Sequence, residues 1–234
     1  TATQADALTT EDLAAISASS LRALSTAALA ILDSAQFNAM GSAQFNALSS
    51  AQAGAITTAQ AATMTTEDLA ALSTAAIRAL STAALNALDS TQIPSLGTAQ
   101  VQALSTSQIA TLSTQDLNAL STTQFAVLTS AQAGAITSAQ AGALTTDDLA
   151  ALSTASIRAL STAALAALDS AQLAALGTSS ITALSTQQIA NLTTDDLNAL
   201  STTQFAALTS AQVGAITATQ ADALTTEDLA AISA

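Results

Sequence analysis

Large aliphatic side chains recur at every eighth position of this chain. Every residue whose number is a multiple of eight, from Leu8 to Ile232, is Leu, Ile or Met. Three residues before each stands a second, mostly apolar residue, such as Leu13 or Phe37. We number the positions of the octad 1–8, with the large aliphatic residue at position 8. The typical octad then reads S-T-x-Q-Φ-x-A-L, where Φ is apolar and x is variable.

An eight-residue period excludes a long amphipathic helix and a β-strand. In one continuous helix the position-8 column would drift by about 80° per octad, so the apolar residues would wind around the surface. In a strand, two apolar sites three residues apart would point to opposite faces. Within a single octad, however, a spacing of three places both apolar residues on one face of a short helix.

The hydroxyl residues at position 1 predict that each octad starts a new helix. Ser or Thr followed three residues later by Gln or Asp is the capping-box pattern, in which each side chain satisfies a backbone N–H of the other residue. Ser105 with Gln108, Ser121 with Gln124 and Thr145 with Asp148 match it. The same cap position also holds residues that are acceptable N-caps, namely Asp33, Asp89, Asp169, Gly41, Gly97 and Gly177.

Helices of one and a half turns are not stable alone in water, so they must stack on one another. The sequence therefore predicts an all-α solenoid, a superhelix with one very short helix per octapeptide and three to four octads per turn. The large Phe125 is followed by the small Ala133 and Ala141 at the same octad position, which favours three octads per turn, since one large and two small side chains would then share a layer. Stacking at about 8–10 Å per turn predicts a monomeric rod of roughly 70–100 Å.

Longer repeats lie on top of the octad. Residues 65–144 and 145–224 align as two blocks of ten octads, and residues 9–64 form a shorter block. Residues 217–234 repeat residues 1–18 without a change, so the unit restarts there. We expect residues 1–234 to form a single octapeptide-repeat solenoid that was cut from a longer array.

Composition and charge exclude most chemistry. The chain has no His, Cys, Trp or Tyr, three basic and 16 acidic residues, and a net charge of −13. Thiol, imidazole and zinc chemistry are therefore absent, and nucleic-acid binding lacks its cationic residues. Ser, Thr and Gln are too frequent for a membrane-spanning helix. We identify no catalytic, cofactor-binding or metal-binding residue and expect neither a cofactor nor enzymatic activity.

The charged residues have structural explanations. Adjacent acids, as in Glu67-Asp68 and Asp147-Asp148, fall in the first helical turn, where negative charge complements the helix dipole. Weak Ca²⁺ binding to such pairs is the alternative. Arg22, Arg78 and Arg158 each lie ten residues after one acid and eleven before another, which predicts ion pairs across adjacent octads, with an anion or ligand site as the alternative.

Two further features concern packing. Each of Phe45, Phe125 and Phe205 is followed by two octads with a small residue at position 5, which predicts a filled core, with a local ligand groove as the alternative. Pro94 falls inside a predicted helix and removes a hydrogen-bond donor there, so we expect an irregular step at that point.

Units such as Leu104-Ser105-Thr106-Ser107-Gln108-Ile109-Ala110-Thr111-Leu112 resemble the octapeptide arrays of very large bacterial proteins labelled haem-utilisation or adhesion proteins. The resemblance implies an extracellular or cell-surface location and a stalk-like role. Haem ligation gets no support, because there is no His or Tyr and both Met residues occupy apolar positions. We therefore expect a structural, semi-rigid spacer in an adhesin-like protein. The alternative is a superhelical module that binds a peptide, a glycan or a neighbouring repeat array.

Overall fold

The computed structural model describes Ala5 and residues 7–232. It divides into two compact units, Thr1–Leu120 (unit 1) and Ser121–Ala234 (unit 2), which we describe separately. From Thr9 onward each octad forms one short helix, and no helix of the described residues exceeds seven residues. The described residues contain no β-strand. The predicted all-α architecture is confirmed.

The helices of unit 1 follow one another at eight-residue intervals. They are α2 (Thr10–Ala15), α3 (Ala18–Leu21), α4 (Thr26–Ala30), α5 (Ser34–Asn38), α6 (Ser42–Ala47), α7 (Ser50–Gly54), α8 (Thr58–Thr63), α9 (Thr66–Ala71), α10 (Thr74–Ala79), α11 (Thr82–Leu85), the 3-10 helix η1 (Ile93–Ser95), α12 (Thr98–Ala103), α13 (Thr106–Thr111) and α14 (Thr114–Asn118).

Unit 2 repeats this arrangement. Its helices are α15 (Thr122–Ala126), α16 (Ser130–Gly134), α17 (Ser138–Ala143), α18 (Thr146–Ala151), α19 (Thr154–Ala159), α20 (Thr162–Leu165), α21 (Ser170–Ala174), α22 (Thr178–Ala183), α23 (Thr186–Ala190), α24 (Thr194–Asn198), α25 (Thr202–Ala206), α26 (Ser210–Val213), α27 (Ala218–Ala223) and α28 (Thr226–Ile232).

The position-1 residues cap these helices as predicted. At α15 the Ser121 Oγ accepts from the Gln124 N–H at 3.3 Å, and the Gln124 Oε1 accepts from the Ser121 N–H at 2.7 Å. Ser105 and Gln108 make the same reciprocal pair. The remaining cap positions of the prediction, Gly41, Gly97 and Gly177 with Asp33, Asp89 and Asp169, also begin their helical turns.

The capping box predicted for Thr145 with Asp148 is only half formed. The Thr145 Oγ1 accepts from the Asp148 N–H at 3.2 Å, but the same hydroxyl donates to the Asp148 Oδ2 at 2.6 Å. At this site the shorter Asp side chain binds the cap hydroxyl in place of the cap N–H, whereas Asp12 accepts from both the hydroxyl and the N–H of Thr9.

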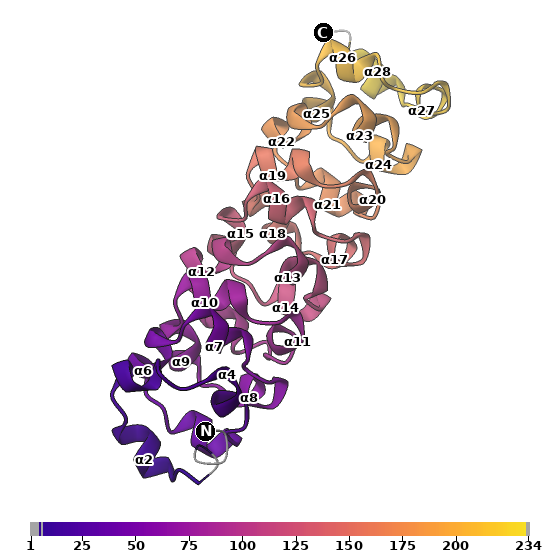
Figure 1. Ribbon diagram of the computed structural model, residues 1–234. Coiled ribbons are helices and arrows are strands. Elements are labelled where there is room, and N and C mark those ends of the chain that lie inside the picture. The colour runs from indigo at the N-terminus through magenta and orange to yellow at the C-terminus, as the bar shows by residue number, and fades with distance from the viewer. Residues whose placement is uncertain (1–4, 6, 233–234) are drawn as a thin grey trace. The chain divides into compact units, whose positions relative to one another are not determined.

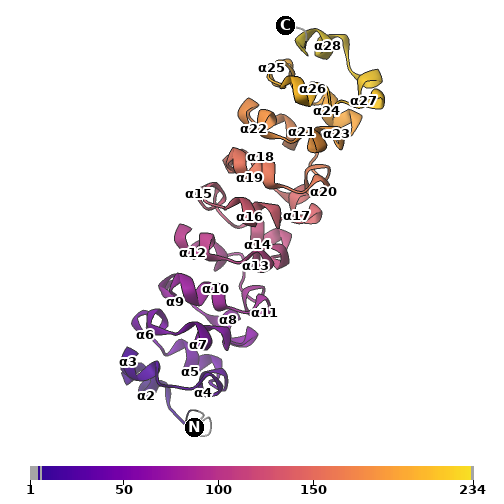
Figure 2. The same ribbon diagram turned by 45° about the horizontal axis from the view of Figure 1, so that its top comes forward.

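Each helix packs on the helix three octads further along the chain. In unit 1 the helices α6, α7 and α8 make one turn of the solenoid, and α9, α10 and α11 lie on them in the same order (Figure 2). In unit 2 the helices α16, α19, α22, α25 and α28 form one continuous stack (Figure 1). Helices three octads apart are thus in contact, whereas the side-chain bonds described below reach back 28 to 31 residues. Each unit therefore has between three and four octads per turn, as predicted.

The core consists of the two apolar positions of the octad. Throughout the interior of each unit, position-5 side chains are almost wholly inaccessible and position-8 side chains are about 3–4% exposed. Phe125, Ala133 and Ala141 occupy the position-5 sites of the consecutive helices α15, α16 and α17, and all three are fully buried. The one-large, two-small packing predicted for this layer is confirmed.

Position 6 determines how closely successive turns approach. A Cβ added at Gly54 would lie 3.2 Å from the Ala79 carbonyl oxygen, and one at Gly134 would lie 3.0 Å from the Ala159 oxygen. A side chain at these sites would crowd the backbone of the next turn, which favours glycine there. The irregular step predicted at Pro94 is also present, because residues 93–95 form a 3-10 helix.

Candidate functional site

Buried glutamines connect the successive turns of the solenoid. The position-4 Gln side chains lie in the interior although they are polar; Gln60 and Gln108, for example, are only 1% exposed. In the glutamines named below, Oε1 accepts a hydrogen bond from the backbone N–H at position 1 of the same octad, and Nε2 donates to a carbonyl oxygen 28 or 31 residues earlier. We call this set the glutamine ladder, and its described members are Gln36, Gln44, Gln52, Gln60, Gln92, Gln100, Gln108, Gln172, Gln188, Gln204, Gln212 and Gln220.

The geometry at Gln60 shows what the ladder does. Its Nε2 lies 2.9 Å from the carbonyl oxygens of both Leu29 and Leu32, at the C-terminal end of the octad four earlier. The last carbonyls of a helix have no partner within that helix. Burying them unpaired would cost about 1–3 kcal/mol. One Gln side chain therefore completes the N-terminus of its own helix and the C-terminus of another.

The sequence indicated only the capping half of this role. Gln and Glu both offer an oxygen to the cap N–H, but only Gln also has N–H donors. Position 4 contains Gln repeatedly and never Glu. That preference is the signal from which the inter-turn hydrogen bonds could have been inferred.

Where position 4 is not Gln, asparagine can supply the inter-turn bond in the opposite direction. The Nδ2 of Asn38, Asn46 and Asn198, all at position 6, donates to a carbonyl 25 residues later at 2.7, 3.1 and 2.9 Å. The octads four after these asparagines have Asp68, Ala76 and Asp228 at position 4. At position 4 of another octad, the Ser156 Oγ donates to the Leu128 oxygen at 2.9 Å.

The two acids of each adjacent pair occupy different environments. Glu67 is exposed at position 3, whereas Asp68 at position 4 is 6% exposed and accepts from the Thr65 hydroxyl at 2.6 Å. Asp147 and Asp148 divide in the same way. No group of three or more acidic residues able to hold a metal ion occurs in the described part of the chain. The position-4 acids of these pairs are therefore parts of helix caps.

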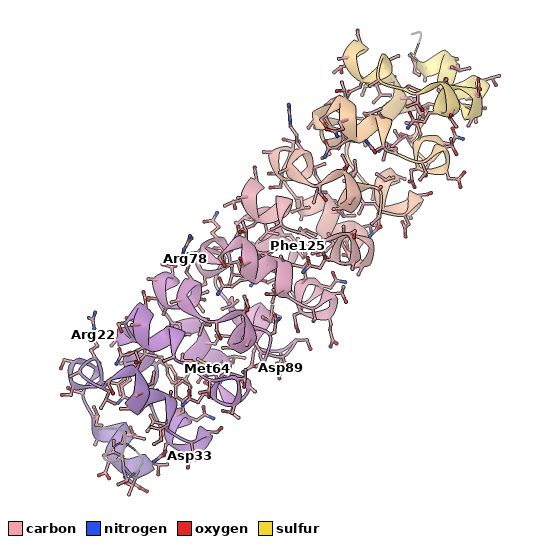
Figure 3. The ribbon with its side chains drawn as sticks, turned by 45° about the vertical axis from the view of Figure 1, so that its right-hand side comes forward. Arg22, Asp33, Met64, Arg78, Asp89 and Phe125 are labelled. Atoms are coloured by element: carbon pink, nitrogen blue, oxygen red, sulfur yellow. The ribbon has the colours of Figure 1, made fainter. Side chains whose placement is uncertain are left out.

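The arginines do not form the predicted ion pairs. Arg22, Arg78 and Arg158 are exposed, and no described carboxylate lies within 4.0 Å of any of them. Figure 3 shows the reason in unit 1, because Arg22 and Arg78 lie along one long edge in this view and Asp33 and Asp89 lie along the opposite edge. Eleven residues span between a third and a half of a turn of the solenoid, which places each of these arginines and the aspartate that follows it on different sides.

A surface groove of about 460 Å³ lies beside Arg22. It is lined by residues of three successive turns, which include the polar Asn46, Ser49, Ser50 and Ser73 and the apolar Ala47, Leu48 and Ala75. One N–H of the Asn46 amide is used by the Ala71 carbonyl, and the Arg22 guanidinium meets no acceptor in the described residues. The groove is thus a site with unused N–H donors and one positive charge.

The repeat itself is matched by a known family. The model of the ALTTAQ repeat matches residues 5–42, 32–66, 62–98, 110–146, 142–178, 165–194 and 189–226. The chain belongs to the ALTTAQ repeat family. The tandem array predicted from the octapeptide is confirmed, and each ALTTAQ window is longer than the 24 residues of three octads. A comparison with curated proteins gave no match.

Successive ALTTAQ windows follow one another along the array, as expected if every window represents the same stacked unit. None of the helices in the described part of this ALTTAQ array has the length and apolarity needed to cross a membrane.

Proposed function

We propose that this array is a semi-rigid spacer that holds other parts of a large bacterial surface or secreted protein apart, and that it is not an enzyme. The glutamine ladder supports the proposal most directly. Its hydrogen bonds connect successive turns at many points in both units, and Asn38, Asn46 and Asn198 add such bonds, so the array resists bending and unwinding between turns. The outward positions 2, 3 and 6 carry mainly Ala, Ser, Thr, Asn and Gly, with few of the aromatic or Arg residues that dominate binding surfaces.

The adhesin-like and extracellular parts of this proposal come from the resemblance of the octapeptide to arrays in large bacterial surface proteins. A chain without cysteine is compatible with an oxidising environment. Antibody labelling of intact cells that express the parent protein would test the location. Labelling only after the cells are permeabilised would contradict it.

A length measurement tests the spacer role. The chain has no native Cys, so single dyes can be attached at Ala35→Cys and Ala211→Cys, both exposed positions. Inserting an unlabelled copy of residues 145–184 or 145–224, with Ala kept at the site equivalent to 211, directly before residue 145 adds half a block or a whole block of octads. A stacked array should lengthen by about 2–3 Å per octad, because a turn of three to four octads rises about 8–10 Å.

A flexible chain behaves differently, since its end-to-end distance grows with the square root of its length. A square-root dependence, or no increase, would contradict the spacer. A matched control carries both dyes in unit 1, at Ala35→Cys and Ala99→Cys. Their separation should not change when residues 145–224 are duplicated.

The alternative role, a binding module, is favoured by one observation. The groove beside Arg22 has unused hydrogen-bond donors, and it is large enough for one side chain or one sugar ring. The spacer remains our conclusion, because the inter-turn hydrogen bonds extend over both units and the groove involves one site.

A further inference from the structure

All the positive charge of this acidic chain resides in three side chains, Arg22, Arg78 and Arg158. Each is at position 6 of its octad, exposed and without a carboxylate within 4.0 Å among the described residues. Arg22 borders the polar groove described above. Three octads after each arginine, position 6 again has a hydrogen-bonding side chain, namely Asn46, Gln102 or Thr182, where Ala and Gly are the common residues.

A second set of side chains offers the matching charge. Asp33, Asp89 and Asp169 are exposed N-cap residues, and each uses Oδ1 to accept from the backbone N–H three residues later at 2.8 Å. Their Oδ2 atoms accept no hydrogen bond from a described residue. The position-4 acids differ, because a hydroxyl occupies the corresponding oxygen, as Thr65 does at Asp68. The cap aspartates therefore present an outward carboxylate oxygen from a fixed position.

The two sets also match in spacing. Arg22 and Arg78 are 56 residues, or seven octads, apart, and so are Asp33 and Asp89. In unit 1 they lie along opposite long edges (Figure 3). We call Arg22 and Arg78 the arginine edge and Asp33 and Asp89 the aspartate edge. Two parallel copies can therefore place every arginine of one edge against an aspartate of the other without a change of register.

We propose that these arrays associate side by side, with the arginine edge of one copy bound to the aspartate edge of a second copy. The Oδ2 of Asp33 enters the groove beside Arg22 of the neighbour, where the guanidinium and the free N–H of Asn46 donate to it. Such a contact is heterologous, so each copy keeps one edge free and further copies can add to it. It goes beyond the spacer role, because it converts single stalks into bundles.

The net charge of −13 limits this association to conditions in which long-range repulsion is screened. At physiological salt the Debye length is about 8 Å, so repulsion between whole chains is weakened while contacts at hydrogen-bond distance persist. Dilute chains then remain monomeric, as the sequence predicts, and association grows with concentration. In arrays with many blocks, each added block contributes a further arginine and aspartate.

Three variants and one mixture test the contact by sedimentation velocity with refractive-index detection, since the chain has no Trp or Tyr. The arginine variant carries Arg22→Gln, Arg78→Gln and Arg158→Gln. The aspartate variant carries Asp33→Asn, Asp89→Asn and Asp169→Asn, and Asn is an equally good N-cap. The matched control carries Glu11→Gln, Glu67→Gln and Asp147→Asn, which removes three negative charges from exposed position-3 residues with the same block spacing.

Wild type and control should associate from micromolar to millimolar concentration at physiological salt. The arginine and aspartate variants should each bind about tenfold or more weakly. An equimolar mixture of these two variants should form heterodimers and nothing larger, because each supplies the edge that the other lacks. The proposal is wrong if wild type stays monomeric, if the two variants associate like wild type, if the control loses association, or if the mixture stays monomeric.

Discussion

Replacing Gln188 by Glu isolates the inter-turn half of the glutamine ladder. Gln188 is 3% exposed; its Oε1 accepts from the Ser185 N–H, and its Nε2 donates to the carbonyl oxygens of Leu160 at 2.9 Å and Arg158 at 3.3 Å. Glu retains the acceptor oxygen and nearly the same volume. It loses both donors and places a carboxylate against two carbonyl oxygens.

The expected loss of stability follows from these contacts. Each net hydrogen bond contributes about 0.5–1.5 kcal/mol, and an unpaired buried carbonyl costs about 1–3 kcal/mol. Because only the Leu160 bond is short and buried, we expect the free energy of unfolding to fall by about 2–4 kcal/mol at neutral pH. Urea unfolding followed by circular dichroism measures this difference.

Gln187→Glu is a matched control in the same helical turn. Gln187 is exposed, and a carboxylate there gains the same favourable interaction with the N-terminus of α23. We expect its effect to lie within about 0.5 kcal/mol of zero, as for other surface changes. Equal effects of the two substitutions would refute the role assigned to the ladder.

The pH dependence of the Gln188→Glu variant provides a second check. Burial beside carbonyl oxygens should raise the folded-state pKa of the introduced carboxyl group above its ordinary value of about 4.3, because only the protonated acid can donate. The folded variant then binds more protons than the unfolded one between these two pKa values. The deficit relative to Gln187→Glu should therefore shrink as pH falls through the folded pKa, and a deficit independent of pH would contradict the donor argument.

Three further predictions concern caps, packing and charge. Ser121→Ala should cost about 1 kcal/mol as a lost cap, and Leu120→Ala about 2–5 kcal/mol as a core cavity, both measured by urea unfolding; equal losses would contradict the assignment of inside and outside. Gly134→Ala should lower stability by about 1–3 kcal/mol, because its Cβ would lie 3.0 Å from the Ala159 oxygen, whereas Gly177→Ser should raise it by a few tenths, since nothing lies within 4 Å. Hydrogen bonds from the Thr91 hydroxyl, and then from the Gln92 and Thr91 N–H groups, lower the pKa of Asp89. The stability that the Asp89 carboxylate contributes is therefore present above the ordinary pKa of 3.8 and is lost as pH falls through the folded-state pKa. Asp89→Asn should flatten the acid side of the plot of melting temperature against pH, and an unchanged plot would refute this.

The octapeptide predicted the local structure because the forces that fix it act within eight residues. Caps such as Ser105 with Gln108 depend on neighbours three positions apart, and the two apolar positions select one helical face. The number of octads per turn could be limited to three or four, but the sequence pattern of Phe125, Ala133 and Ala141, which favours three, does not fix it. Pro94 likewise acts on its own turn.

The contacts between turns could not be predicted in the same way. The Nε2 bonds of Gln60 depend on which residues of the preceding turn lie next to it, and that depends on the number of octads per turn. The ion pairs predicted for Arg22 failed for the same reason, since a separation of eleven residues places Asp33 on the opposite edge. Asn38 supplies an inter-turn bond because position 4 of the octad four later is Asp68 and not Gln. That relation between distant octads can be recognised only once the fold is known.

The reach of the glutamine ladder has a consequence for how the chain acquires its structure. Within the two units, each ladder bond of an octad joins it to residues no more than 31 positions earlier. The mean sequence separation between contacting residues therefore stays nearly constant as the array lengthens. A small separation relative to chain length, which is a low contact order, favours rapid folding. A growing chain can complete each turn once about four octads have emerged, starting from its N-terminus. Duplication of a block therefore adds length to the protein without adding a slow folding step.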